Sequence, residues 1–140
     1  MTAEARRRGG AEETEHLNQI SGMVVDAAIE VHRTLGGPGR LESVYEEALV
    51  HELGLRGLHV ERQCALPIVY KGVELGSPLR LDLLAEGSVV VECKATTQSL
   101  RIFEAQVLTY LRISKRRLGL LLNFGAPRLI DGLLRIVNDL

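Results

Sequence analysis

The chain has 140 residues, of which 46% are apolar, and its 17 basic and 18 acidic side chains leave a formal net charge of −1. This length suits one globular domain with a substantial core and is too short for two. The near-zero net charge excludes a global positive field. Any nucleic-acid binding must therefore depend on a local basic patch.

The first residues along the chain carry little structural signal. Residues 1–14 are polar, aperiodic and glycine-containing, which predicts a disordered tail ahead of a single domain over residues 15–140. An apolar stripe over residues 17–35 predicts a first helix, which Thr14 is placed to cap. The glycine-rich segment 36–39 ends that helix, because glycines permit positive φ and proline stops propagation.

A second helix and a β region follow. Apolar residues at helical spacing predict a helix from Leu41 to about Leu55. Beyond it, β-branched and aromatic runs bounded by turn residues predict strands, with a Lys71-Gly72 turn between two of them. The expected strands are residues 58–65, 67–70, 79–84 and 89–95.

The C-terminal third returns to helix and strand. Ser99 is placed to cap a third helix that runs to about Ser114. The almost wholly apolar run 118–123 is typical of a strand buried on both faces. Periodicity leaves residues 129–137 open between a last strand and a short helix. The predicted core order is therefore helix, three antiparallel strands, helix, strand.

The two cysteines and the apolar segments bear on the compartment. Cys64 and Cys93 have no paired spacing and no accompanying histidine pattern, which predicts reduced, buried thiols and argues against zinc. No apolar run approaches the roughly 18 residues of a membrane span, and the N-terminus lacks the apolar region of a signal peptide. We therefore expect a cytoplasmic protein that does not contact membranes.

An acidic residue and a Glu-x-Lys pair lie on two consecutive predicted strands. Side chains alternate faces along a strand, so Glu92 and Lys94 point to one side and Cys93 to the other. Asp82 joins that side if the connecting loop is odd, as with Ala85-Glu86-Gly87. Two carboxylates and a lysine on one patch describe a divalent-metal site with a charged helper. The alternative is a cross-strand ion pair on a solvated face.

Four short motifs together give the chain a family resemblance. They are Gly39-x-x-Glu42-x-x-Tyr45, Asp82, Glu92-x-Lys94 and Gln106-x-x-x-Tyr110. Over about residues 17 to 138 the chain resembles the bacterial GxxExxY proteins of the PD-(D/E)xK nuclease superfamily. The resemblance implies an α/β restriction-endonuclease-like fold with an α-β-β-β-α-β core, an additional N-terminal helix and a mixed sheet flanked by helices. Leu81 stands where the signature has proline, a position that carries no chemistry.

The resemblance also implies a chemistry. Asp82 and Glu92 would be direct metal ligands, the main-chain carbonyl of Cys93 a third, and Glu42 would reach in from its helix. The expected ion is Mg²⁺, for which Mn²⁺ can substitute, because clustered carboxylates repel a phosphodiester unless a cation lies between them. Lys94 would orient or help to deprotonate the attacking water, whose pKa the metal lowers. Hydrolysis would leave a 5′-phosphate.

Gln106 and Tyr110 are four residues apart, on one helix face. The resemblance implies that both belong to the catalytic site: Gln106 would position the nucleophile or the phosphate, and Tyr110 would pack on or bond to the strand. The alternative is an ordinary half-buried aromatic residue beside a solvated glutamine.

The densest basic cluster follows Tyr110. We interpret it as a candidate nucleic-acid contact, although cations at a helix C-terminus are also favoured by the helix dipole alone. Its members are Arg112, Lys115, Arg116 and Arg117.

These observations support a working function with two alternatives. We expect a metal-dependent nuclease that hydrolyses phosphodiester bonds in nucleic acid, DNA in the first instance. The first alternative is a non-catalytic nucleic-acid-binding or protein-interaction module that retains the fold, and the second is an acidic cluster that forms a structural ion-pair network. No separate DNA-binding domain is visible, so a homodimer or a partner protein is a further expectation for the active form.

Overall fold

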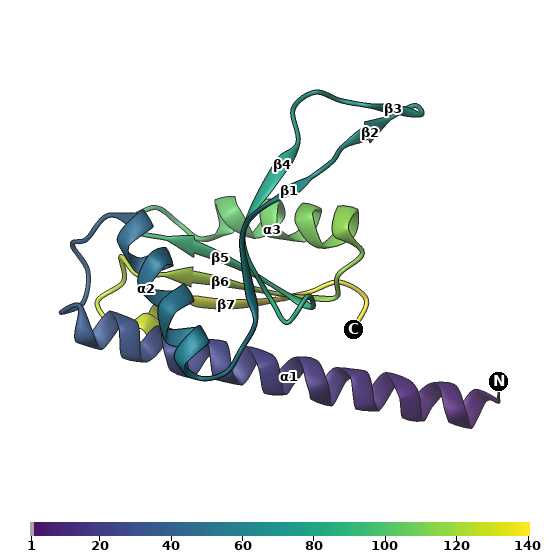
Figure 1. Ribbon diagram of the computed structural model, residues 1–140, viewed down its shortest axis with the longest axis horizontal. Helices are drawn as coiled ribbons and strands as arrows, with labels where there is room; N and C mark the ends of the chain where they lie inside the picture. The colour runs from purple at the N-terminus through teal and green to yellow at the C-terminus, as the bar shows by residue number, and fades with distance from the viewer. Residues whose placement is uncertain (1) are drawn as a thin grey trace.

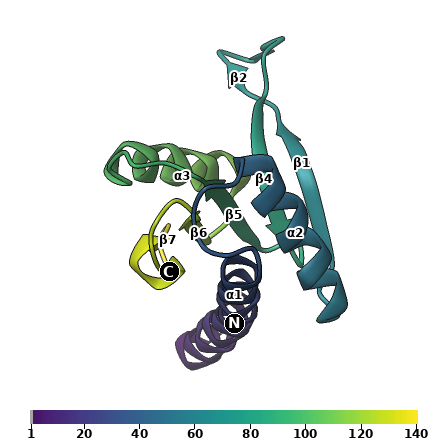
Figure 2. The ribbon, with the colours of Figure 1, turned by 90° about the vertical axis from the view of Figure 1, so that its left-hand side faces the viewer.

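The computed structural model describes residues 2–140. A central sheet carries α3 on one face and α1 and α2 on the other (Figures 1 and 2). The elements are α1 (Ala3–Thr34), α2 (Glu42–Leu55), β1 (Val60–Leu66), β2 (Val69–Tyr70), β3 (Val73–Glu74), β4 (Leu79–Ala85), β5 (Val89–Lys94), α3 (Arg101–Ser114), β6 (Leu118–Asn123), the 3-10 turn η1 (Leu129–Gly132) and β7 (Leu133–Val137).

The sheet has five strands in the order β1-β4-β5-β6-β7. β1, β4 and β5 are mutually antiparallel, β5 and β6 are parallel, and β7 is antiparallel to β6. The parallel pair needs a crossover, which α3 supplies. The chain order α2, β1, β4, β5, α3, β6 confirms the predicted α-β-β-β-α-β core, its mixed sheet and the additional N-terminal helix.

The core divides between the two faces of the sheet. Along β5, Val91 and Cys93 pack in the cluster that includes α1 and α2, whereas Val90 packs with α3. Every residue of β6 is buried, which confirms the interpretation of run 118–123 as a strand covered on both faces. Even-numbered positions of β5 therefore face α3, which places Glu92 and Lys94 on that side.

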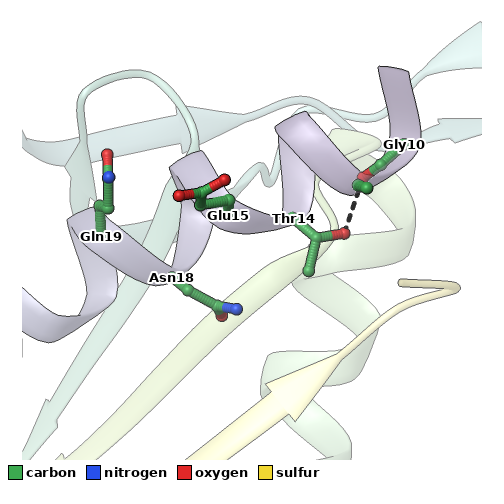
Figure 3. Close-up of a pocket in the computed structure, with 6 residues that line it drawn as sticks. Gly10, Thr14, Glu15, Asn18 and Gln19 are labelled. Atoms are coloured by element: carbon green, nitrogen blue, oxygen red, sulfur yellow. Dashed lines mark hydrogen bonds between the residues drawn. The ribbon is translucent and has the colours of Figure 1, made fainter. Parts of the chain in front are cut away.

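The first helix begins at Ala3, well before the expected start, and includes residues 3–14 of the segment predicted as a disordered tail. Met1, also in that segment, lies outside the described residues. The Thr2 hydroxyl caps it by accepting from the Ala5 N–H at 3.1 Å. Thr14 is not a cap: its hydroxyl donates to the Gly10 carbonyl at 2.9 Å within the helix (Figure 3). Alanine, glutamate and arginine favour helix enough to carry it through two glycines. Burial against the sheet begins at Leu17.

An arm formed by residues 67–78 projects from the sheet between β1 and β4 (Figures 1 and 2). Its tip is the predicted Lys71-Gly72 turn, where both residues have positive φ, 49° and 82°. At the other end of the chain, segment 129–137, which periodicity left open, forms a short helical turn, η1, and then a strand, β7.

None of the helices within residues 2–140 combines the length and apolar character needed to cross a bilayer.

Candidate functional site

The β4–β5 turn decides whether the predicted acidic residues share a face. Glu86 and Gly87 have positive φ, 53° and 63°, and the Ser88 N–H donates to the Ala85 carbonyl at 3.0 Å. Since Ala85 still pairs with Val89, the loop is residues 86–88, one residue later than expected but odd, as expected. The register that results brings Asp82 opposite Glu92.

Where Asp82 and Glu92 meet, hydrogen bonds to their side chains take the place of backbone pairing between β4 and β5. Backbone pairing of β4 with β5 extends to Leu83 and Val91. Beyond that pair, the Asp82 N–H donates to Glu92 Oε1 at 3.0 Å. The Cys93 N–H donates to Asp82 Oδ2 at 2.9 Å. β4 leaves β5 here on its way to the arm, and the two carboxyl groups bridge the widening gap.

The pair is electrostatically unfavourable while both carboxyls are charged. Glu92 is 2% exposed, and burial raises its pKa to about 8, with the negative charge of Asp82 adding to the rise. Burial also raises the pKa of Asp82, although the hydrogen bond from Cys93 opposes that rise. A cation would relieve both effects. Two adjacent carboxylates are the hard oxygen ligands that Mg²⁺ uses, so this donor set fits a divalent ion.

Glu42 approaches the pair without joining it. It is the first residue of α2, and burial raises its pKa with a further contribution from Asp82, whereas Lys94 and the Ala95 backbone lower it. Within residues 2–140, however, no three His, Cys, Asp or Glu side chains gather closely enough to hold a metal ion. The structure therefore forms a pair, with Glu42 nearby. The Cys93 thiol is buried in the opposite core.

Lys94 lies among these acids and rests on an aromatic ring. Its charge lowers the pKa values of Glu42, Asp82 and Glu92. Its Nζ lies 4.7 Å from the centroid of the Phe103 ring, a cation–π contact. Phe103 was missed from the sequence. Its signal was an aromatic side chain in the first turn of the helix that covers the Glu-x-Lys face.

Gln106 and Tyr110 meet on α3 as their spacing predicts. Gln106 Nε2 donates to the Tyr110 hydroxyl at 2.7 Å. Tyr110 is buried and faces the acidic pair: burial, followed by the charges of Glu92 and Asp82, raises its pKa. Gln106 is exposed. A buried hydroxyl beside the acids thus holds an accessible amide.

Glu46 is a further acid near the pair, and it is buried. It is 5% exposed and accepts from Arg62 Nε at 2.9 Å and from Gln63 Nε2 at 2.8 Å. Its negative charge contributes to the raised pKa of Asp82. On α2 it lies one helical turn after Glu42, which is the position in the sequence that indicates its closeness to the site. Gln63 has φ 55°, and it and Asp82 are the residues that the β1–β4 pairing skips between Arg62–Leu83 and Cys64–Leu81.

The basic cluster lies at the other end of the sheet. It precedes Leu118, which pairs with Val89, whereas Lys94 pairs with Asn123. Five residues of strand separate these positions, about 16 Å at the usual rise. The cluster therefore does not line the carboxylate pair.

Two members of the cluster are engaged within the chain. Arg117 forms an ion pair with Glu13 at 3.0 Å and donates to the Asp139 carbonyl. Arg116 donates to the Ser114 carbonyl at 2.9 Å, and its Nε is buried without a partner among residues 2–140. The other two members, Arg112 and Lys115, are exposed.

Comparison with protein families identifies the superfamily of this chain. The family model described as the PD-(D/E)XK nuclease superfamily matches residues 18–136. No match was found among curated proteins or among solved structures. The matched span includes the acidic pair, Lys94, α3 and the basic cluster.

Proposed function

Since this chain belongs to the PD-(D/E)XK nuclease superfamily, we propose that it is a metal-dependent nuclease that hydrolyses phosphodiester bonds in DNA and leaves a 5′-phosphate. Within the superfamily we assign it to the bacterial GxxExxY group, on the motif from Gly39 to Tyr45. The observation that carries the proposal is the Asp82–Glu92 pair, in which Glu92 is buried and Asp82 half-buried, with Lys94 on the same face of β5. Burial, followed by the charge of Asp82, raises the pKa of Glu92, so ionising both carboxyls is unfavourable unless a cation binds them.

The proposed ion is Mg²⁺, with Mn²⁺ as a substitute. Asp82, Glu92 and the Cys93 carbonyl would hold it, and Glu42 would approach from α2. When bound, a divalent ion lowers the pKa of a water ligand and stabilises charge that develops on the phosphate. The chain itself keeps water away from the base of the site, since Glu92 and Cys93 are buried.

Three side chains complete the proposed chemistry. Lys94, steadied by the Phe103 ring, would orient the attacking water and take part in its deprotonation. The exposed Gln106 amide, held by the Tyr110 hydroxyl, would contact the scissile phosphate. A strand that reaches both this site and the basic cluster would follow α3, where the exposed Arg112 and Lys115 are the most accessible contacts.

One observation favours a second candidate, a non-catalytic binding module. Asp82 and Glu92 each already accept a backbone N–H, and the described residues gather no third acid beside them. A non-catalytic protein that uses these two acids only to hydrogen-bond β4 to β5 would have the same structure here. Such a module, like the nuclease, could act as a homodimer or with a partner protein.

Metal titration on nucleic acid tests the choice. Purified protein is incubated with Mg²⁺ or Mn²⁺ and with single- and double-stranded DNA and RNA, beside Asp82→Ala and a matched control, Asp26→Ala, whose carboxylate is exposed on α1. We expect metal-dependent cleavage by the wild type and the control and none by Asp82→Ala. Binding with a steep salt dependence but no cleavage of any strand would establish the binding module instead.

A further inference from the structure

A cavity of about 510 Å³ adjoins the acidic site at the end of β5. Residues 38–40 form one wall, residues 95–98 form the other, and Gly125 lies between them. The first wall leads directly into Glu42 and the second continues from Lys94. The side chain of Asn123, which pairs with Lys94 in the strand register, holds the second wall in place. The volume lies in the range of ligand pockets.

The wall at residues 95–98 is held from inside by a buried amide. Asn123 is 7% exposed; its Oδ1 accepts from the Thr96 N–H at 3.0 Å and from the Gly125 N–H at 2.9 Å. Its Nδ2 donates to the Thr96 carbonyl at 3.0 Å. A Cβ on Gly125 would lie 2.6 Å from the Thr96 nitrogen, so only glycine fits the contact. The wall is therefore rigid before any ligand arrives.

The wall at residues 38–40 is held by the tyrosine of the Gly-x-x-Glu-x-x-Tyr motif. The Tyr45 hydroxyl accepts from the Arg40 N–H at 3.0 Å and donates to the Gly37 carbonyl at 2.6 Å. Its fully buried ring is stacked on Phe124, with centroids 4.7 Å apart and planes 12° from parallel. The motif thus fixes the backbone from which the Arg40 side chain extends.

Arg40 is the charged residue of the lining, and it is exposed. Within residues 2–140 its guanidinium has no hydrogen-bond or ion-pair partner, whereas Arg33, Arg62 and Arg117 are all paired. A planar guanidinium matches the geometry of phosphate oxygens. Thr97 and Gln98 add neutral polar groups to the same cavity.

We propose that this cavity is a strand-binding subsite in which Arg40 binds a backbone phosphate next to the one that is cleaved, and that Tyr45 is a positioning residue for Arg40. The inference rests on the proposed nuclease function, because the adjoining site is what gives the cavity a strand to hold. Binding measured without cleavage separates the two proposals.

The first experiment measures binding of a labelled DNA oligonucleotide by fluorescence anisotropy in EDTA, over a range of salt concentrations. Arg40→Gln should weaken binding by about tenfold and reduce the slope of log K against log salt by about 1. Arg40→Lys should keep the slope, because it keeps the charge. Arg7→Gln, which removes the same charge from the first turns of α1, should change neither quantity.

The second experiment locates the phosphate. An uncharged methylphosphonate replaces each backbone phosphate of the oligonucleotide in turn. At one position it should weaken binding to the wild type and leave Arg40→Gln unaffected, since the partner charge is already gone. Tyr45→Phe should likewise weaken binding by the wild type and add nothing in the Arg40→Gln background. A purely structural role of Tyr45 would lower binding equally in both.

The outcomes are distinct. Three results would overturn the subsite. The first is a wild-type salt slope and affinity in Arg40→Gln, and the second is an equal loss of binding in Arg40→Gln and Arg7→Gln. The third is that the wild type binds no strand at all. Binding that depends on Arg40 in a protein that cleaves nothing would refute the nuclease and retain the subsite. If Arg40→Gln changes neither KM nor kcat of cleavage, the nuclease is retained and the subsite is refuted.

Discussion

Asp82 and Glu92 are tied to each other's strand: the Asp82 N–H donates to Glu92 Oε1, and Asp82 Oδ2 accepts from the N–H of Cys93. Each carboxyl thus uses one oxygen as a substitute for a ladder carbonyl, and its second oxygen lies outside these two bonds. Strand pairing and the acidic pair are therefore one structure. We expect changes in the charge of the pair to alter the stability of the whole sheet.

Asp82→Asn should raise the melting temperature of the metal-free protein and abolish its response to Mg²⁺. The amide keeps an acceptor for the Cys93 N–H, removes a negative charge that burial makes unfavourable, and removes a proposed ligand. Thermal unfolding with and without Mg²⁺ measures both effects, with Asp26→Asn as the control. An unchanged metal response in Asp82→Asn would place the ion elsewhere.

The stability of the metal-free protein should fall as pH rises from about 4.5 to about 8. The pKa of Glu92 is raised from 4.5 to about 8, so the folded state binds more protons than the unfolded state across that window. Stability is greatest below the lower value and is lost as pH approaches the upper one, by at most about 1.4 kcal/mol per pH unit. Denaturant unfolding at several pH values should show this slope flattened in Glu92→Gln. It should persist in Glu104→Gln, which removes an exposed acid of α3.

Lys94→Ala should reduce phosphodiester hydrolysis by roughly 10²-fold or more and leave metal binding intact, because it removes the proposed water-orienting group and neither carboxylate. Phe103→Leu should cause a smaller loss, since Lys94 keeps its charge but loses the ring beneath it. Lys71→Ala, at the tip of the arm, is the matched control. Cleavage rates measure the effect, and full activity of Lys94→Ala would exclude its proposed role.

Most helices and strands were predictable because the side chains that they bury recur in the sequence at the spacing of a helix or a strand. The run 118–123 and the stripe from Leu17 both lie where the core requires them. The start of α1 was missed because residues 3–16 are mostly exposed, so propensity and a Thr2 cap, and no apolar stripe, decide their structure. Periodicity does not report such helices.

The candidate site was predictable where it depends on parity and not where it depends on tertiary contacts. An odd β4–β5 loop brings Asp82 opposite Glu92, and helical spacing brings Gln106 to Tyr110. The burial of Glu46 and the ring beneath Lys94 arise from β1 and α3 packing against elements distant in sequence. The sequence shows where both residues lie on their helices, but it does not show the partners that they contact.

Arg112→Gln with Lys115→Gln should weaken nucleic-acid binding and flatten its salt dependence without changing the melting temperature, because both side chains are exposed. Arg116→Ala with Arg117→Ala should also destabilise the fold, since Arg117 binds Glu13 and the Asp139 carbonyl. Anisotropy and thermal unfolding of both double variants separate the two effects. Equal destabilisation by both pairs would contradict the assignment.

Gly125→Ala should destabilise the protein by about 1–3 kcal/mol, because its Cβ would lie 2.6 Å from the Thr96 nitrogen and neither backbone can move easily. Gly22→Ala, in the middle of α1 with nothing within 4 Å of the added carbon, should instead stabilise by about 0.5–1 kcal/mol. Denaturant unfolding compares the two. A neutral Gly125→Ala would show that the wall at residues 95–98 is mobile.

The carboxylate pair and the cavity wall differ in how far apart their parts lie along the chain. Asp82 and Glu92 are 10 residues apart within one hairpin, whereas Asn123 reaches Thr96 across 27 residues, after α3 has crossed over the sheet. Short loops close at lower entropic cost, and non-local parallel pairing is slow. During folding, the two repelling acids should therefore come together first and the cavity beside them last, so a partly folded chain would hold its charges without its subsite.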